Sequence, residues 1–168
     1  MDNLVAETEE ESLVVENEVS QDFTGKIYKA QSRLLDCGSA YTGEEFDKIN
    51  PLVHTFADGM YIRQITMPAG QIIISKIHGQ THPYFILKGD VSVMTEDGVK
   101  RYKAPYSGIT EAGTKRVLYT HEETVWTTVQ RTNETDLEKI EEDVMIKETD
   151  MDFISEESID KLLEGTEL

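Results

Sequence analysis

The amino-acid sequence predicts an all-β core that closes into a jelly-roll barrel, flanked by short helices and by acidic arms at both ends. Two observations predict this class. Short runs rich in Ile, Val, Thr and Tyr follow one another at even spacing through the middle of the chain, with turn signals between them. Helical spacing of apolar residues is found only before and after these runs.

Residues 23–55 form a lead-in that we expect to be helical in two short pieces. Thr24 caps the first piece, which ends near Gly38. Thr42-Gly43-Glu44-Glu45 fits a capping box at the start of the second piece, where Thr and Glu side chains satisfy free backbone N–H groups. Asn50-Pro51 ends it, because a residue before proline disfavours the helical conformation.

A β-barrel domain is predicted over residues 56–132. Glu96-Asp97-Gly98 is a strong hairpin signal within it, and further turns are expected at 68–70, 88–90 and 112–114. About eight short strands between such turns are typical of a sandwich or a small jelly roll. The expected strands are 60–67, 71–77, 84–88, 91–95, 99–103, 106–110, 115–120 and 124–130.

Residues 133–168 are predicted to be an acidic, helical C-terminal extension. Its first helix begins near Thr135 or Asp136 and places three apolar residues on one face: Leu137, Ile140 and Val144. Ser155 is the expected cap of a last short helix.

The net charge of −17 comes from the two ends of the chain. Residues 1–22, which we interpret as a flexible arm, carry −8, and residues 133–168 carry −11, whereas residues 23–132 carry +2. Acidic ends repel nucleic acid and anionic membranes, so neither is an expected partner. The arms are either solvated tails or segments that dock on protein partners and support self-assembly.

Cys37 is the single cysteine, so no intramolecular disulfide is expected, which fits a reducing compartment. The first residues lack the basic and apolar regions of a signal peptide, and no apolar run approaches the ~20 residues of a membrane span. We therefore expect a soluble protein inside a cell, or a component of a particle assembled there.

A glycine-bounded segment, Gly70 to Gly89, carries the most specific pattern. A glycine, a strand, three clustered polar positions, a second strand and a closing glycine resemble the first metal-binding motif of cupins. Cupins that bind metal usually carry His, His and Glu at the three positions, where this chain has Lys76, His78 and His82. Residues two apart on a strand face the same side, so Lys76 and His78 are expected to point into the barrel together.

The second cupin motif resembles the stretch from Glu111 to Arg116, which keeps a glycine at position 113. Arg116 stands where cupins carry a fourth metal ligand, and Glu111 stands in for a proline. This resemblance implies four inward positions in the barrel: Lys76, His78, His82 and Arg116.

Two cations beside two imidazoles disfavour a divalent metal, and arginine cannot deprotonate to become a ligand. The expectation is therefore no cofactor; were a metal present, His78 and His82 would be its ligands. The same four residues suit a carboxylate or phosphate, held by charge-assisted hydrogen bonds. In the plainer alternative Lys76 and Arg116 point outward or pair with acidic residues: Glu111, Glu122 or Glu123. No catalytic constellation stands out.

Residues 56–132 also resemble small cupin-like proteins common in tailed bacteriophages and prophages. The matching stretches are Gly59-Met60-Tyr61-Ile62-Arg63, Pro68-Ala69-Gly70, Lys76-Ile77-His78, Lys88-Gly89, Ala104-Pro105, Gly113-Thr114-Lys115-Arg116 and Thr124-Val125-Trp126-Thr127-Thr128. This resemblance implies a jelly-roll barrel in a phage setting, located in the host-cell cytoplasm or in the virion.

Three functions are consistent with these patterns. The first is a non-catalytic phage-type protein whose barrel serves assembly or interaction, with a homo-oligomer as the expected state. The second is a module that binds or sequesters a small anionic ligand. The third is a metal-dependent cupin enzyme. We favour them in that order. The fold by itself does not decide between them.

Overall fold

The computed structural model describes residues 23–36, 38 and 40–146. The acidic arm at 1–22, Cys37 and the helix expected after Ser155 lie outside the described residues.

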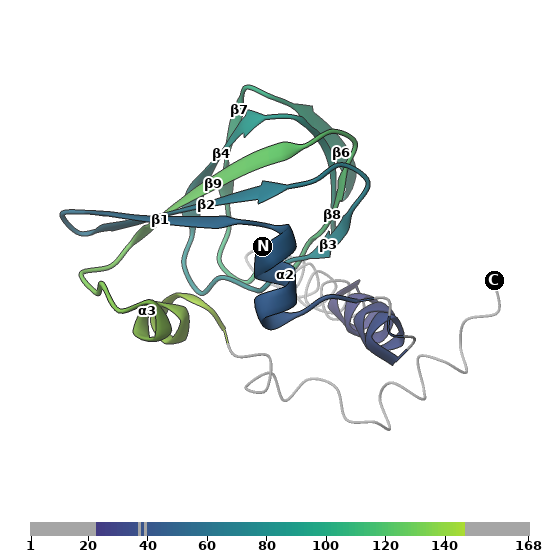
Figure 1. The fold of residues 1–168 in the computed structure, drawn as a ribbon, viewed down its shortest axis with the longest axis horizontal. Helices are drawn as coiled ribbons and strands as arrows, with labels where there is room; N and C mark the ends of the chain where they lie inside the picture. The colour runs from purple at the N-terminus through teal and green to yellow at the C-terminus, as the bar shows by residue number, and fades with distance from the viewer. Residues whose placement is uncertain (1–22, 37, 39, 147–168) are drawn as a thin grey trace, which may run out of the picture.

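Nine antiparallel strands form two sheets that face each other as a cupin-like jelly roll, which confirms the predicted all-β core (Figure 1). The five-stranded sheet has the order β1 (Leu52–Ala57), β2 (Met60–Met67), β9 (Thr124–Arg131), β4 (His82–Lys88), β7 (Tyr106–Thr110). The four-stranded sheet has the order β3 (Ile72–Ile74), β8 (Val117–Thr120), β5 (Asp90–Thr95), β6 (Gly98–Lys103).

The core lies between the sheets because alternate residues of each strand face inward. On the five-stranded sheet Ile65, Trp126 and Ile86 lie opposite one another on neighbouring strands and are all buried. The same core cluster contains Met67, Ile73, Tyr84, Val91, Val93 and Leu118.

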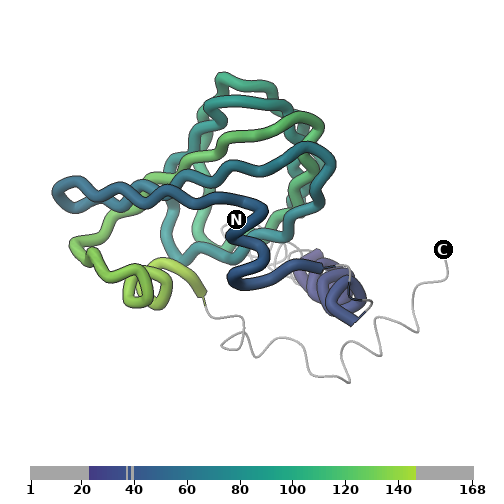
Figure 2. The backbone as a smooth tube through the Cα atoms, in the orientation of Figure 1, coloured from purple at the N-terminus to yellow at the C-terminus, as the bar shows by residue number. Residues whose placement is uncertain are grey.

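Apart from two places, the predicted strands match the observed ones to within two residues at each end. β1 is an additional strand, whose hairpin with β2 projects from the barrel (Figure 2). Its side chains are mostly exposed, so the apolar alternation that identifies a strand is weak there. β3 ends at Ile74 rather than at the predicted residue 77, and the chain between it and β4 is irregular.

Helices flank the barrel as predicted. Residues 23–36 are helical, and α2 (Gly43–Ile49) ends at Asn50. Thr42 is the N-cap of α2 but makes no side-chain capping bond, so the predicted capping box is not formed. In α3 (Leu137–Val144) the Asp136 carboxylate accepts hydrogen bonds from two backbone N–H groups of the first turn. None of the helices in the described part of the chain is long and apolar enough to cross a membrane.

Gly89 lies where the chain passes from β4 to β5, and therefore from one sheet to the other. Its φ of +99° is in the region that favours glycine, and an added Cβ would lie 2.5 Å from the carbonyl oxygen of Glu123. The glycine predicted to close the 70–89 segment is thus required by backbone packing against the start of β9.

Candidate functional site

The structure places three of the four predicted site residues at one end of the barrel. His82 begins β4, Arg116 immediately precedes β8, and His78 lies in the irregular segment between β3 and β4. Backbone hydrogen bonds fix this segment: Ser75 N–H donates to the Arg116 carbonyl (3.0 Å), and Gly113 N–H donates to the His78 carbonyl (2.9 Å).

Lys76 does not share the interior with His78, which differs from the prediction. Its side chain is 63% exposed and forms an ion pair with Glu141 of α3. The physical reason is that Ile73 and Ile77 are the buried positions of this segment, so Lys76 falls on the outward side of the alternation, together with the exposed Ile72. An outward-pointing Lys76 was the second alternative drawn from the sequence. The acidic partner is Glu141 of α3, however, and not Glu111, Glu122 or Glu123.

His78 and His82 lie against each other, with ring centroids 4.4 Å apart. His82 is buried, and its Nδ1 lies 2.8 Å from the Gln80 carbonyl oxygen, so Nδ1–H donates and Nε2 is left unprotonated in the neutral ring. Nδ1 of His78 contacts the side-chain amide of Gln130. Burial, together with the positive charge of neighbouring groups, lowers the pKa of His78 to about 3.

Burial also lowers the pKa of His82, an effect that its hydrogen bond with Gln80 opposes and the charge of Arg116 reinforces. Both imidazoles are therefore neutral at physiological pH. They contribute hydrogen-bonding groups to the barrel interior and no positive charge.

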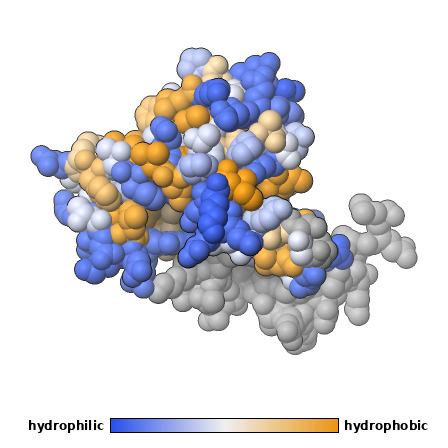
Figure 3. All heavy atoms as spheres, in the orientation of Figure 1, coloured by the Kyte–Doolittle hydropathy of each residue, from blue (hydrophilic) through white to orange (hydrophobic). Residues whose placement is uncertain are grey.

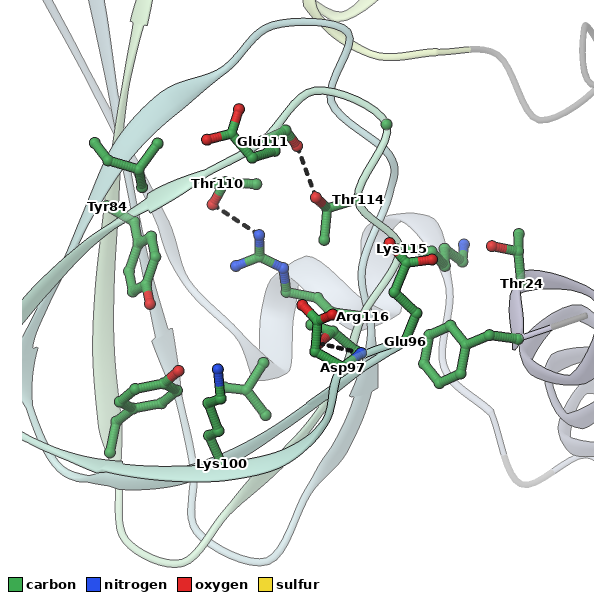
Figure 4. Close-up of a pocket in the computed structure, with 16 residues that line it drawn as sticks. Thr24, Tyr84, Glu96, Asp97, Lys100, Thr110, Glu111, Thr114, Lys115 and Arg116 are labelled. Carbon is green, nitrogen blue, oxygen red and sulfur yellow. Dashed lines mark hydrogen bonds between the residues drawn. The ribbon is translucent and has the colours of Figure 1, made fainter. Parts of the chain in front are cut away.

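Arg116 is half-buried, and its guanidinium lies over two aromatic rings. Its Cζ atom is 5.7 Å from the centroid of Tyr84 and 5.8 Å from that of Trp126. Nη2 donates to Oγ1 of Thr110 at 2.7 Å (Figure 4). No carboxylate of the described residues forms an ion pair with Arg116, and burial lowers its pKa without removing its charge.

Arg63 is a second interior cation, which was not predicted from the sequence. It lies opposite Thr128 of β9, on the same face of β2 as the buried Ile65 and Met67. Its alternation with these two apolar residues along the sequence could have identified Arg63 as an inward-facing position. Burial lowers the pKa of Arg63, and electrostatic interactions with Tyr61 and then with Asp47 oppose that effect.

A cavity of about 260 Å³ opens at this end of the barrel, with Arg116 in its middle (Figure 4). Its inner wall includes Tyr84 of β4, Val93 of β5 and Tyr102 of β6. Phe23 of the 23–36 helix also lines it. The remaining lining carries charged side chains of both signs: Glu96, Asp97, Lys100, Glu111 and Lys115.

Tyr84 is held by close packing on both sides. Its ring stacks on Trp126 with centroids 4.5 Å apart, and it lies opposite Gly108 of β7. A Cβ at Gly108 would lie 2.7 Å from the Tyr84 hydroxyl oxygen, so this glycine provides the space for the ring. Burial, with smaller effects of Tyr102 and Tyr106, raises the pKa of Tyr84 to about 12 and keeps its hydroxyl protonated.

The residues present do not fit a cupin-type metal centre. Lys76 is on the surface and Arg116 is a cation, so only two of the four motif positions offer metal ligands. Within the described ranges no group of three or more His, Cys, Asp or Glu side chains is close enough to hold a metal ion. We therefore derive no chemistry through a metal.

No known family model and no curated protein matches this sequence. Solved structures with a similar backbone include the cupin domain of Cnp3 from Schizosaccharomyces pombe, with 17% identity and a TM-score of 0.42, over 54% of this chain and 64% of that one. The DMSP lyase DddQ from Ruegeria pomeroyi has 18% identity and a TM-score of 0.48, over 59% and 55%.

A putative ethanolamine utilization protein Q from Salmonella typhimurium has 13% identity and a TM-score of 0.42, over 48% of this chain and 67% of that one. Similarities at this level carry no argument about function, and none of these three proteins is described as a phage protein. The function must therefore be inferred from the residues of this chain.

Proposed function

We propose that the barrel is a binding module for a small anionic ligand, which Arg116 holds. The observation that carries this proposal is a half-buried guanidinium that faces a cavity and has no carboxylate partner among the described residues. A charge removed from water is costly unless an opposite charge compensates it. A bound anion supplies that compensation through charge-assisted hydrogen bonds.

The neighbours of Arg116 support the same function. Thr110 accepts a hydrogen bond from the guanidinium, and the ring centroids of Tyr84 and Trp126 lie 5.7 Å and 5.8 Å from its carbon, so the side chain is pre-organised before a ligand arrives. His78 and His82 are neutral, so they add no positive charge that would repel the guanidinium. The buried Lys115 adds a positive charge to the cavity lining, and Arg63 adds one to the interior outside that lining.

Thermal unfolding in a panel of sodium salts of small anions tests this function. The wild-type chain should be stabilised by at least one anion, and the Arg116→Gln variant should not be. Arg131→Gln is the matched control, because Arg131 is exposed at the end of β9 and the same charge is removed outside the barrel. Equal stabilisation of the wild type and Arg116→Gln, or none for any anion, would contradict the proposal.

A second proposal is the assembly role in the phage setting that the sequence resemblance implies. Its support is a set of exposed apolar side chains on the five-stranded sheet, where Figure 3 shows apolar residues gathered. Val53, Phe85 and Leu87 are 53%, 37% and 56% exposed. Phe85 lies between the uncharged Thr127 and Ser107. Two copies of a chain with net charge −17 repel each other, so self-association needs a contact surface without charge.

We therefore expect a second copy of this chain to cover that face. Native mass spectrometry should show a dimer or larger oligomer, and Phe85→Lys should return it to a monomer. Detection of the protein in purified phage particles would support the virion-associated form of this role. A wild-type monomer that is absent from particles would contradict it.

A further inference from the structure

The surroundings of Arg116 also restrict the chemical class of the ligand. The guanidinium carbon lies 5.7 Å from the ring centroid of Tyr84 and 5.8 Å from that of Trp126, and one Nη2–H is used by Thr110. The donors that remain lie in the guanidinium plane. A planar carboxylate accepts two parallel hydrogen bonds from such an edge, so its plane continues that of the guanidinium.

The walls next to this position are aromatic. Tyr84 and Tyr102 both line the cavity, and Tyr106 connects them, with ring centroids 6.2 Å from Tyr84 and 4.4 Å from Tyr102. The buried Val93 adds an apolar surface. Aromatic rings pack favourably on a flat, unsaturated body through offset stacking or edge-to-face contacts.

The charges around the cavity favour a single negative charge on the ligand. Arg116 is the cation in the middle, and the rest of the lining carries two lysines, Lys100 and Lys115, and three carboxylates, Glu96, Asp97 and Glu111. The positive and negative side chains are thus equal in number, so the lining has no surplus positive charge to hold a doubly charged phosphate. One guanidinium edge also leaves several oxygens of a phosphate without donors.

We propose that the ligand is a flat carboxylate, an aromatic or conjugated acid, with its carboxylate on Arg116 and its body against Tyr84 and Tyr102. This inference rests on the proposed anion-binding function. The inference narrows the proposed ligands from small anions in general to flat carboxylates. It excludes inorganic phosphate and short aliphatic acids.

Isothermal titration calorimetry on the full chain tests the inference with five probes: benzoate, cyclohexanecarboxylate, acetate, benzamide and inorganic phosphate. Benzoate should bind most tightly. Benzamide and acetate should each bind at least tenfold more weakly, because the first lacks the charge and the second lacks the ring. Cyclohexanecarboxylate, of similar size but not flat, should be severalfold weaker, and phosphate should show no saturable binding.

Two variants assign the selectivity to the aromatic wall. Tyr102→Leu should lose the preference for benzoate over acetate, and Tyr102→Phe, which keeps the ring, should retain it. If phosphate or acetate binds as tightly as benzoate to the wild type, this inference fails while the anion-binding function stands. If no anion binds, both fail.

Discussion

At the scale of single residues, Arg116 determines what this barrel can do. Its charge is stabilised by two aromatic rings and one hydroxyl, with no counter-ion in the described part of the chain. Cation–π contacts contribute about 0.5–2 kcal/mol each. That is less than full compensation for the desolvation of a charge, so the free protein retains an unfavourable interaction that a ligand relieves.

We therefore expect Arg116→Met to separate stability from binding. The methionine removes a desolvated charge and keeps an apolar contact with Tyr84 and Trp126, so the free energy of unfolding should be unchanged or higher. Anion-induced stabilisation should disappear. Chemical denaturation with and without benzoate measures both quantities. A variant that is destabilised by several kcal/mol would mean that Arg116 has a structural role.

Gly108 is the second residue whose identity the site requires. Gly108→Ala should displace the Tyr84 ring, lower stability by about 1–3 kcal/mol through overpacking and weaken anion binding. Gly79→Ala is the matched control, because a Cβ at position 79 would lie 3.6 Å from the nearest side-chain atom, which is an ordinary van der Waals distance. Urea denaturation of both variants measures the difference. Equal effects would argue against the close approach of Tyr84 to Gly108.

At the scale of elements, α3 covers the end of the barrel beside His78. Ile140 and Val144 are buried against Tyr61 of β2. The chain after the helix pairs with the His78 segment, because Gly79 N–H donates to the Val144 carbonyl and Ile146 N–H donates to the Ile77 carbonyl. The acidic C-terminal extension thus begins with a helix that is part of the folded domain.

Ile140→Ala should accordingly cost about 2–5 kcal/mol of stability through a cavity under α3. Leu137→Ala, on the same helix but 43% exposed, should cost much less. Guanidinium denaturation compares the two. If Ile140→Ala is no more destabilising than Leu137→Ala, α3 does not pack on the barrel as described.

The strands also show how much of the structure could be predicted from the sequence. Strand alternation and turn signals identified β2 and β4 to β9, because packing on a common core imposes that pattern. The inward position expected for Lys76 was wrong because Ile73 and Ile77 are the buried residues of that segment, which leaves Lys76 on the outward side. Arg63 was missed because it lies outside both cupin motifs, although its alternation with Ile65 and Met67 pointed inward.

At the scale of the whole molecule, stability should depend on pH through the buried histidines. The pKa of His78 is about 3 in the folded chain and 6.5 in a model peptide, so the unfolded chain binds more protons between these values. Stability contributed by the neutral ring is complete above pH 6.5 and is lost as pH falls toward 3. The loss by pH 4.5 is roughly 3 kcal/mol.

Asp90 and Tyr84 act outside most of that window, whereas His54 and His82, whose pKa values are also lowered, titrate within it. Ion pairs with Arg101 and Lys103 lower the pKa of Asp90 to about 2, so its contribution is lost below 3.8. The raised pKa of Tyr84 matters only above pH 10. Urea denaturation at pH 7.0 and 4.5 should therefore show a smaller difference for His78→Gln than for the wild type. An equal difference in both would contradict this assignment and leave the lowered pKa values of His54 and His82 as the remaining sources.

The central claim, that an anion binds on Arg116 inside the barrel, can be tested with the intrinsic fluorescence of Trp126. It is the only tryptophan of the chain, and its ring lies 5.8 Å from the guanidinium carbon of Arg116. Titration with benzoate should give a saturable change in emission for the wild type and for Arg131→Gln, and none for Arg116→Gln. An unchanged spectrum in the wild type, or the same saturable change in Arg116→Gln, would contradict the claim.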